Sequence, residues 1–290
     1  MSERPIQFWF RGAIRQVEGA APTRSLLDWL REDMRATGTK EGCAEGDCGA
    51  CTVVLGEAVG RSLQLRAVNA CIRFLPTLDG KALFTVEDLA TLAGPGRLHP
   101  VQQALASGHG SQCGFCTPGF AMSLFALYEN HPACPSRRAV IDALAGNLCR
   151  CTGYRPIVDA LPAAYRLPPV RLDRGPILAA LATLAALPPL DYRAGGRRFL
   201  APRSLAELAA ARQANPGARL VAGATDLALT KALRDPGDLL WLGAVPELAT
   251  IHRTPDGGLV IGAAASLADA FAALVAFEPG WAELARRFAG

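Results

Sequence analysis

The hydrophobic pattern of the first 80 residues predicts a small sheet built around one helix. Residues 6–10 (IQFWF) have the composition of a strand, and the turn at Arg11–Gly12 leads into a partner strand. Residues 25–34 have helical spacing, with their leucines on one side. Two further strand-like runs, 51–55 and 64–72, follow a loop rich in cysteine and glycine.

Between residues 81 and 165 the pattern changes to short helices with recognisable ends. Proline or serine stands at or just before each start, as expected for N-caps and first helical turns, and glycine follows two of the helices. Four helices of this length predict a small bundle. The predicted helices are 101–107, 119–130, 137–145 and 157–165.

The remainder of the chain predicts an α/β unit behind a linker. Residues 166–192, rich in proline and leucine, are expected to be a linker that contains one helix at 177–187. The expected organisation is α+β and multidomain, with domains at 1–80, 81–165 and 193–290. In the last domain the predicted elements are a helix at 204–213, a strand at 218–223, a helix at 225–233, a strand at 238–243 and a strand that runs into a turn at 258–267.

Composition narrows the possible functions. The 290 residues are 50% hydrophobic and 19% charged, enough apolar material for more than one core. The net charge of +4 is spread thinly, with no basic run interleaved with aromatic residues, which argues against nucleic-acid binding. The sequence shows no signal peptide and no membrane span, so we expect a cytoplasmic protein with no membrane partner. In that compartment its nine cysteines favour metal or redox chemistry over disulfides.

Three cysteines and four glycines fall within residues 38–53, GTKEGCAEGDCGACTV. Cys43, Cys48 and Cys51, followed at a distance by Cys71, match the plant-type ferredoxin spacing C-x4-C-x2-C…C of a 2Fe-2S cluster. Such a cluster is a compact anion, and it needs backbone N–H groups aimed at its sulfurs. Glycine lets the main chain wrap closely around it, so the loop lacks bulk because its backbone contacts the cluster.

A structural zinc site is the alternative for these four thiols, because four cysteines also suit tetrahedral zinc. Zinc sites usually present paired C-x2-C units, however, and three ligands in one glycine-rich loop are unusual for them. The spacing therefore favours the 2Fe-2S cluster.

A second set of four cysteines lies in the helical region, with two in SQCGFCTPGF (111–120) and two in NLCRCTGYRP (147–156). Each pair precedes a predicted helix, so the positive ends of two helix dipoles can face one anionic cluster. The spacing alone does not separate a cluster from a four-cysteine zinc site. Cys134 is left over, and we interpret it as a bystander thiol in a loop.

Four segments in order resemble the iron–sulfur portion of the xanthine dehydrogenase family of molybdenum hydroxylases. They are GTKEGCAEGDCGACTV, AVNAC, HGSQCGFCTPGF and AGNLCRCTGYRPI, and the likeness covers about residues 5–165. It is specific because both cysteine sets match together with their flanks. The EGD between Cys43 and Cys48 resembles xanthine dehydrogenases more than aldehyde- or carbon monoxide-oxidising relatives.

The resemblance implies a β-grasp, ferredoxin-like domain followed by a four-helix domain, each holding one 2Fe-2S cluster. Gln112 matches a residue that lies against the pterin of the molybdopterin cofactor on the neighbouring subunit; without the resemblance it is a polar surface residue. Carried over, the ligands of the first cluster are Cys43, Cys48, Cys51 and Cys71, and those of the second are Cys113, Cys116, Cys149 and Cys151.

Residues 219–231, RLVAGATDLALTK, are typical of a strand, a glycine-containing turn and a helix. With Thr225 or Asp226 as cap, such a turn can bind a pyrophosphate, although most of them only connect elements. The segment resembles the start of the family's FAD domain. The family continues beyond the point that matches WAELARRFAG. We therefore expect a truncated α/β FAD domain, and an FAD site that is incomplete in this chain. The residues implied to wrap the flavin diphosphate are Leu220, Val221, Ala222, Gly223, Ala224, Thr225, Asp226 and Leu227.

The resemblance implies the electron-transfer subunit of a xanthine dehydrogenase-like hetero-oligomer. A molybdenum-cofactor-binding large subunit would hydroxylate a purine, and electrons would pass through the two clusters to FAD and then to NAD. We expect no catalytic residue on this chain, since its four histidines lie in separate loops. Two alternatives are the corresponding subunit for another heterocycle or an aldehyde, and a zinc-stabilised interaction module without catalysis.

Overall fold

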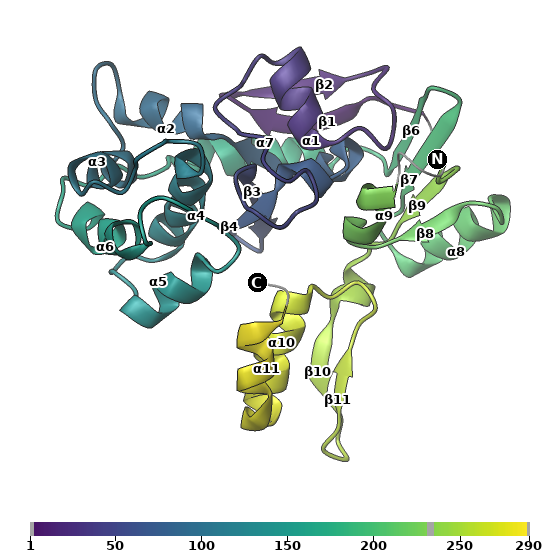
Figure 1. Ribbon diagram of the computed structural model, residues 1–290. Coiled ribbons are helices and arrows are strands. Elements are labelled where there is room, and N and C mark those ends of the chain that lie inside the picture. Colours follow the sequence, from purple (N-terminus) through teal and green to yellow (C-terminus); the bar gives the residue numbers. More distant parts are fainter. Residues whose placement is uncertain (1–2, 231–234, 289–290) are drawn as a thin grey trace. The chain divides into compact units, whose positions relative to one another are not determined.

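The computed structural model describes residues 3–230 and 235–288 (Figure 1). The chain forms two compact units. The cysteine unit contains residues 7–16 and 24–187, and the carboxy-terminal unit contains 1–6, 17–23 and 188–290. Across the described residues, no helix is both long enough and apolar enough to cross a membrane.

A five-stranded sheet, in the order β2-β1-β5-β3-β4, forms the first part of the cysteine unit. The long β3–β4 hairpin is antiparallel, and β5 pairs antiparallel with β3 and parallel with β1. Four of the strands are predicted by the hydrophobic pattern. The fifth lies just past the boundary expected at residue 80, and its three residues are all buried, too short a run to show alternation. The strands are β1 (Ile6–Phe10), β2 (Ala13–Val17), β3 (Thr52–Val59), β4 (Ser62–Asn69) and β5 (Ala82–Phe84).

The helix expected at 25–34 begins as α1 (Leu26–Asp28), capped by the Ser25 hydroxyl, and continues as a π-helical turn at Trp29–Asp33. The wider turn directs both Trp29 and the following leucine into the core. Trp29 packs edge-on against Phe8, with ring centroids 5.3 Å apart. This packing seats the helix on the sheet.

Helix α4 is the centre of the cysteine unit. Its middle is buried on every side, as expected for a helix that is apolar all round. One face, including Phe120 and Leu124, packs in a core with the other helices, and the opposite face, including Met122 and Phe125, packs in a core with the sheet. The four predicted helices are confirmed as α3 (Pro100–Ser107), α4 (Thr117–Asn130), α5 (Arg137–Ala143) and α6 (Arg155–Ala164).

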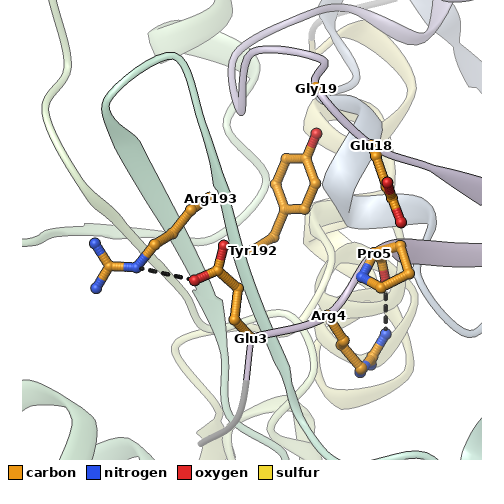
Figure 2. Close-up of a pocket in the computed structure, with 7 residues that line it drawn as sticks. All are labelled: Glu3, Arg4, Pro5, Glu18, Gly19, Tyr192 and Arg193. Carbon is orange, nitrogen blue, oxygen red and sulfur yellow. Dashed lines mark hydrogen bonds and ion pairs between the residues drawn. The ribbon is translucent and has the colours of Figure 1, made fainter.

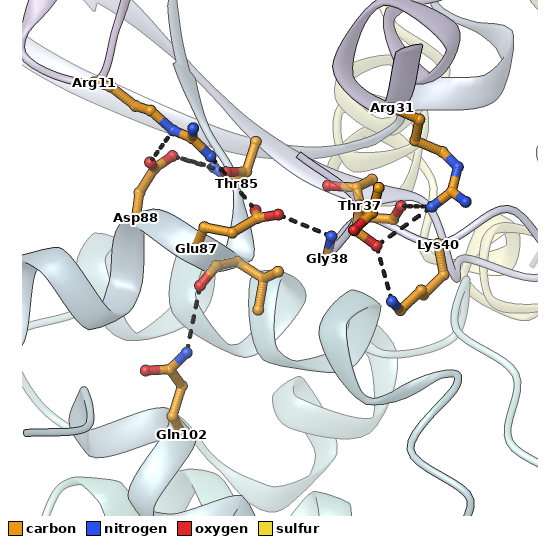
Figure 3. A network of polar contacts seen from close by, with 11 residues as sticks. Arg11, Arg31, Thr37, Gly38, Lys40, Thr85, Glu87, Asp88 and Gln102 are labelled. Atoms are coloured by element: carbon orange, nitrogen blue, oxygen red, sulfur yellow. Dashed lines mark hydrogen bonds and ion pairs between the residues drawn. The ribbon is translucent and has the colours of Figure 1, made fainter. Parts of the chain in front are cut away.

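A further helix, α2 (Val86–Ala93), joins the sheet to the bundle, and the sequence pattern did not predict it. Its start is a capping box formed by Thr85 and Asp88. Figure 3 shows that the same turn is tied to the sheet side: Arg11 pairs with Asp88 at 3.1 Å, and the Glu87 carboxylate accepts the Gly38 N–H at 2.8 Å. Because Gly38 opens the first cysteine loop, this network anchors that loop to α2.

The segment expected to be a linker is part of the fold. Residues 174–185 form α7 (Arg174–Ala185), and Ile177, Leu181 and Leu184 are buried in the core that contains β3, β4 and α4. Arg174 donates to the backbone carbonyl of Leu63, which holds the start of the helix against the sheet. The spacing of its leucines therefore reflects packing, and the prolines that suggest a linker lie at its ends.

The carboxy-terminal unit contains a four-stranded sheet in the order β6-β7-β9-β8 and a separate β10–β11 hairpin. The pairings β7–β9 and β8–β9 are parallel, and β6–β7 is antiparallel. The sequence pattern missed β6, β7 and β10, and the helices α10 and α11. The strands are β6 (Leu190–Ala194), β7 (Arg197–Ala201), β8 (Arg219–Val221), β9 (Leu239–Trp241), β10 (Ile251–Arg253) and β11 (Leu259–Ile261), and the helices are α8 (Leu205–Ala214), α9 (Thr225–Thr230), α10 (Leu267–Phe277) and α11 (Ala282–Arg287).

A surface hollow of about 380 Å³ lies in the same unit, between the chain's first residues and β6 (Figure 2). Four of its polar side chains are already engaged: Tyr192 donates to the Ala20 carbonyl at 2.7 Å, Arg193 pairs with Glu3 at 3.7 Å, and Arg4 donates to backbone carbonyls. We therefore interpret these contacts as structural: they hold the first residues of the chain against β6, and the hollow is not our candidate ligand site.

The position of α7 generates a stability prediction. Leu181 is 3% exposed, so Leu181→Ala removes buried volume and should lower the free energy of unfolding of the cysteine unit by about 2–5 kcal/mol. Thr183→Ala, on the exposed side of the same helix, is the control and should change it by less than about 0.5 kcal/mol. Urea denaturation followed by circular dichroism measures both, and equal midpoints for the two variants would contradict the packing described.

Candidate metal centres

The first set of thiols is brought together by the loop that precedes β3 and by the short 3-10 turn after β4. The Sγ atoms of Cys51 and Cys71 are 3.3 Å apart. Cys43 Sγ accepts the backbone N–H groups of Glu45, Asp47 and Cys48 at 3.5, 3.4 and 3.3 Å. The backbone of the loop thus points its N–H groups at sulfur, as the sequence predicts.

The pKa values of these thiols follow their hydrogen bonds. The hydrogen bond with the Cys71 thiol lowers the pKa of Cys51 to about 7, against the effect of burial. The bond to Cys51, together with burial, raises the pKa of Cys71. Burial raises the pKa of Cys43, but the N–H groups of Cys48 and Glu45 outweigh it and leave that pKa lowered. The environment therefore favours the thiolate, the form that binds metal, at Cys51 and Cys43, and disfavours it at Cys71.

Two glycines of the loop are required by its shape. A Cβ on Gly42 would lie 2.8 Å from Cys48 Sγ, so a side chain there would displace a thiol. Gly49 has a φ of 69°, and a Cβ on it would lie 2.3 Å from the carbonyl oxygen of Gly146. Glycine at position 42 lets the loop lie close to its own sulfurs. Glycine at position 49 lets the loop lie close to the segment that carries the second set of thiols.

The second set lies between two helix starts. Cys116 is the N-cap residue of α4, and the segment with Cys149 and Cys151 leads through Tyr154 into α6. Burial, and then a hydrogen bond with Cys149, raise the pKa of Cys116 to about 12. A hydrogen bond with Cys113 raises the pKa of the exposed Cys151 thiol. These hydrogen bonds join Cys116 to Cys149 and Cys113 to Cys151, and charge interactions also couple Cys116 with Cys113 and Cys151 with Cys149.

This pairwise arrangement bears on the choice between iron–sulfur clusters and zinc. A 2Fe-2S cluster takes two cysteines at each iron, whereas structural zinc gathers four ligands around one ion. The hydrogen bonds that join Cys51 with Cys71, Cys116 with Cys149 and Cys113 with Cys151 match the two cysteines that a 2Fe-2S cluster takes at each iron.

Asn147 joins the two sites, and sequence reasoning missed it. Its side chain is 5% exposed and donates to the carbonyl of Gly49 at 3.0 Å and to the Thr52 hydroxyl at 3.1 Å, while it accepts from Ser123 on α4 at 2.6 Å. The next residue, Leu148, donates its N–H to the carbonyl of Cys48 at 2.9 Å. The sequence around Asn147 carries no local pattern that predicts this role, because the two loops that it joins come together only in the folded protein.

The segment resembling a flavin loop lies in the carboxy-terminal unit. It runs from β8 through an exposed Gly223 into α9, and Ala224 has a left-handed φ of 60°. Thr225 and Asp226 are the first residues of α9, so they occupy its first turn instead of preceding it as caps. Both are exposed, with N–H groups at the helix start. The end of the helix predicted to reach residue 233 lies outside the described residues.

Gln112 and Cys134 complete the predicted set. Gln112 is exposed and adjoins Cys113, which is also exposed. Cys134 is exposed in the loop between α4 and α5 and belongs to neither set of thiols.

Asn147→Ala tests the contact between the two loops. It removes the hydrogen bonds to the Gly49 carbonyl and the Thr52 hydroxyl and leaves the buried Ser123 hydroxyl without its acceptor. The free energy of unfolding should therefore fall by about 2–4 kcal/mol, and the Leu148 amide should exchange faster. Asn130→Ala is a matched control, because Asn130 bridges α4 to the backbone of Leu65 at 2.7 Å and should change exchange there. Hydrogen exchange read by mass spectrometry decides the matter, and unchanged exchange at Leu148 in Asn147→Ala would contradict the proposed bridge.

Comparison with known families gives three matches along the chain. Residues 11–74 match a 2Fe-2S iron-sulfur cluster binding domain, residues 85–162 a [2Fe-2S] binding domain, and residues 193–290 an FAD binding domain in molybdopterin dehydrogenase. The order of these matches confirms the α+β, multidomain fold class.

Individual relatives agree with these matches. The chain is 38% identical to aldehyde oxidase 2 of Cavia porcellus over 300 aligned positions, which cover 85% of this chain and 22% of the relative. It is 50% identical to xanthine dehydrogenase of Emericella nidulans over 157 positions, 53% of this chain and 11% of the relative. A chain of quinoline 2-oxidoreductase from Pseudomonas putida 86 is 36% identical over 56% of this chain and 93% of that one, with a TM-score of 0.47.

The chain thus spans about a fifth of the first of these relatives and about a tenth of the second. Its two cysteine-bearing parts and its carboxy-terminal unit match, in order, the two 2Fe-2S domains and the FAD-binding domain. The chain belongs to the molybdenum hydroxylase family, of which it represents the iron–sulfur and FAD-binding region.

Proposed function

We propose that this chain is the electron-transfer part of a molybdenum hydroxylase and acts with a partner subunit that holds the molybdenum cofactor. The partner oxidises the substrate by hydroxylation, and the electrons released cross this chain to FAD and then to NAD. When bound, the two clusters supply one-electron carriers and the flavin supplies the exchange between single electrons and electron pairs. The chain's own residues hold these groups and set the path between them.

The observation that carries the proposal is the direct contact between the two thiol sites. The carbonyl of Cys48, from the first site, accepts the N–H of Leu148, and Leu148 is bonded to Cys149 of the second. A single hydrogen bond therefore connects the backbone of one proposed ligand, Cys48, to the residue that precedes another, Cys149. Because Asn147 and Gly49 hold this contact from both sides, the spacing between the centres is fixed by buried packing.

The exposure of the thiols supports a direction for electron flow. Cys51 and Cys71 of the first site are buried, whereas Cys113 and Cys151 of the second are exposed. We propose that the molybdenum-bearing partner meets the second site, with the exposed Gln112 against its pterin. In this arrangement electrons reach the second site first and leave through the first site toward the flavin.

A purine is the substrate class that we propose, with another heterocycle or an aldehyde as the second candidate. The EGD between Cys43 and Cys48 and the 50% identity to a xanthine dehydrogenase over the cysteine-bearing part support the first choice. The 38% identity to an aldehyde oxidase over most of the chain supports the second. The residues that select the substrate would lie on the partner.

Metal analysis tests the cofactor assignment. Protein matured in an iron-replete cell should carry about four iron and four acid-labile sulfide atoms per chain, because two sites of four thiols each hold a two-iron cluster. Stoichiometric zinc without sulfide would instead support a zinc-stabilised interaction module and overturn the proposed function.

Cysteine variants locate each cluster. Cys43→Ser or Cys113→Ser should each halve the iron and sulfide content, since each removes a ligand from one site only. Cys134→Ser is the matched control and should keep the full content, because Cys134 lies outside both sites. Loss of iron from Cys134→Ser would show that the ligands are assigned wrongly.

Gly223→Ala tests whether the loop before α9 holds a ligand. A Cβ at Gly223 meets no atom of the protein within 4 Å and its φ is not left-handed, so the fold should tolerate the change. If the flavin diphosphate lies against this loop, the added methyl should weaken FAD binding at least about tenfold.

Gly217→Ala is the matched control, because Gly217 has the same open surroundings outside the proposed loop. Both variants should unfold at the wild-type urea midpoint. In the complete hydroxylase, with the rest of the flavin domain and the molybdenum-bearing partner supplied, only Gly223→Ala should lose FAD, measured by flavin fluorescence after release from the purified complex. Equal FAD content in the two variants would show that the flavin diphosphate does not lie against this loop.

A further inference from the structure

The segment between Cys149 and α6 contains a hydroxyl group that points at a proposed ligand. Thr152 Oγ1 lies 3.2 Å from Cys149 Sγ. The same oxygen accepts the N–H of Tyr154 at 3.2 Å, and the Tyr154 hydroxyl in turn accepts the N–H of Cys149 at 2.9 Å. The three residues therefore form a closed set of hydrogen bonds around one thiol of the second site.

We propose that Thr152 is a positioning residue. Its hydroxyl donates a hydrogen bond to Cys149 Sγ and thereby raises the reduction potential of the second centre. The inference rests on the proposed function, because it assumes that Cys149 ligates a cluster. The proposed function requires two iron–sulfur centres. This inference adds one residue, Thr152, that makes the reduction potential of the second centre differ from that of the first.

The direction of the bond follows from the neighbours of the hydroxyl. A sulfur that ligates iron is a thiolate and has no hydrogen to give. Thr152 Oγ1 already accepts a hydrogen from the backbone of Tyr154, so its own hydrogen is free to be donated. The sulfur is the acceptor that lies within reach.

Backbone strain and packing hold the hydroxyl in place. Gly153 and Tyr154 both have a φ of 68°, and for a tyrosine this left-handed conformation is unfavourable and must be held by its surroundings. The Tyr154 ring packs edge-on against Phe120, a fully buried residue of α4, with centroids 6.2 Å apart. This anchor turns the backbone so that the Tyr154 N–H reaches back to Thr152.

A hydrogen bond to a ligand sulfur stabilises the reduced cluster more than the oxidised one, because the reduced cluster carries one more negative charge. At the first site, Cys43 receives its donors from the backbone, which no side-chain substitution removes. At the second site, one donor is a side-chain hydroxyl, which a substitution can remove together with the acceptor of the Tyr154 N–H.

The test is a potential measurement on the full chain matured with its clusters. Thr152→Val keeps the shape and removes the hydroxyl, whereas Thr152→Ser keeps the hydroxyl. Redox titration followed by electron paramagnetic resonance gives both potentials, and Cys43→Ser and Cys113→Ser, each lacking one centre, assign the two signals.

In Thr152→Val we expect the ratio of reduced to oxidised second centre to fall about threefold to tenfold at a fixed applied potential. A tenfold change corresponds to about 59 mV for one electron. The first centre should keep its wild-type potential in the same sample, and Thr152→Ser should keep both potentials.

Three outcomes would overturn the inference: no shift of the second centre in Thr152→Val, an equal shift of both centres, or the same shift in Thr152→Ser. If Thr152→Val fails to assemble the second centre, Thr152→Ala replaces it; if neither assembles the centre while Thr152→Ser does, the hydroxyl serves assembly and the inference is also overturned. Absence of both signals from the wild-type protein would overturn the proposed function itself.

Discussion

The cysteine unit depends on helix α4, which belongs to two hydrophobic cores at once. The face with Phe120 and Leu124 packs against the other helices, and the face with Met122 and Phe125 packs against the sheet. A helix buried on both sides cannot shift toward one core without opening a cavity in the other. Because Cys116 caps its first turn, this double burial fixes where the second set of thiols lies with respect to the sheet.

The loops meet over the start of the same helix, where small residues allow a close approach. A Cβ on Gly119 would lie 2.1 Å from the carbonyl oxygen of Gly49, so α4 touches the first cysteine loop through backbone alone. Ser123, one turn later, donates to Asn147, whose amide reaches that loop as well. Buried polar groups of this kind specify one arrangement, since any slip would leave them without partners.

The two thiol sites differ in where their hydrogen bonds come from and in how open they are. The first is buried at Cys51 and Cys71 and half-buried at Cys43 and Cys48, and the backbone N–H groups of its own loop point at Cys43. The second is exposed at Cys113 and Cys151, and a side-chain hydroxyl points at Cys149. Two clusters of the same type can thus have different potentials in one chain, which is what transfer in one direction requires.

The sequence by itself determined the elements with strong local signals: the cysteine spacings, the glycines of the first loop, and the four helices with proline or serine at their starts. Tertiary structure decided what depends on partners distant in the chain. Strand β5 forms only between β1 and β3, α7 is a packed helix because β3, β4 and α4 cover it, and Asn147 bridges two loops nearly 100 residues apart. Local patterns record backbone preference and periodic burial, whereas these contacts exist only after the chain has folded.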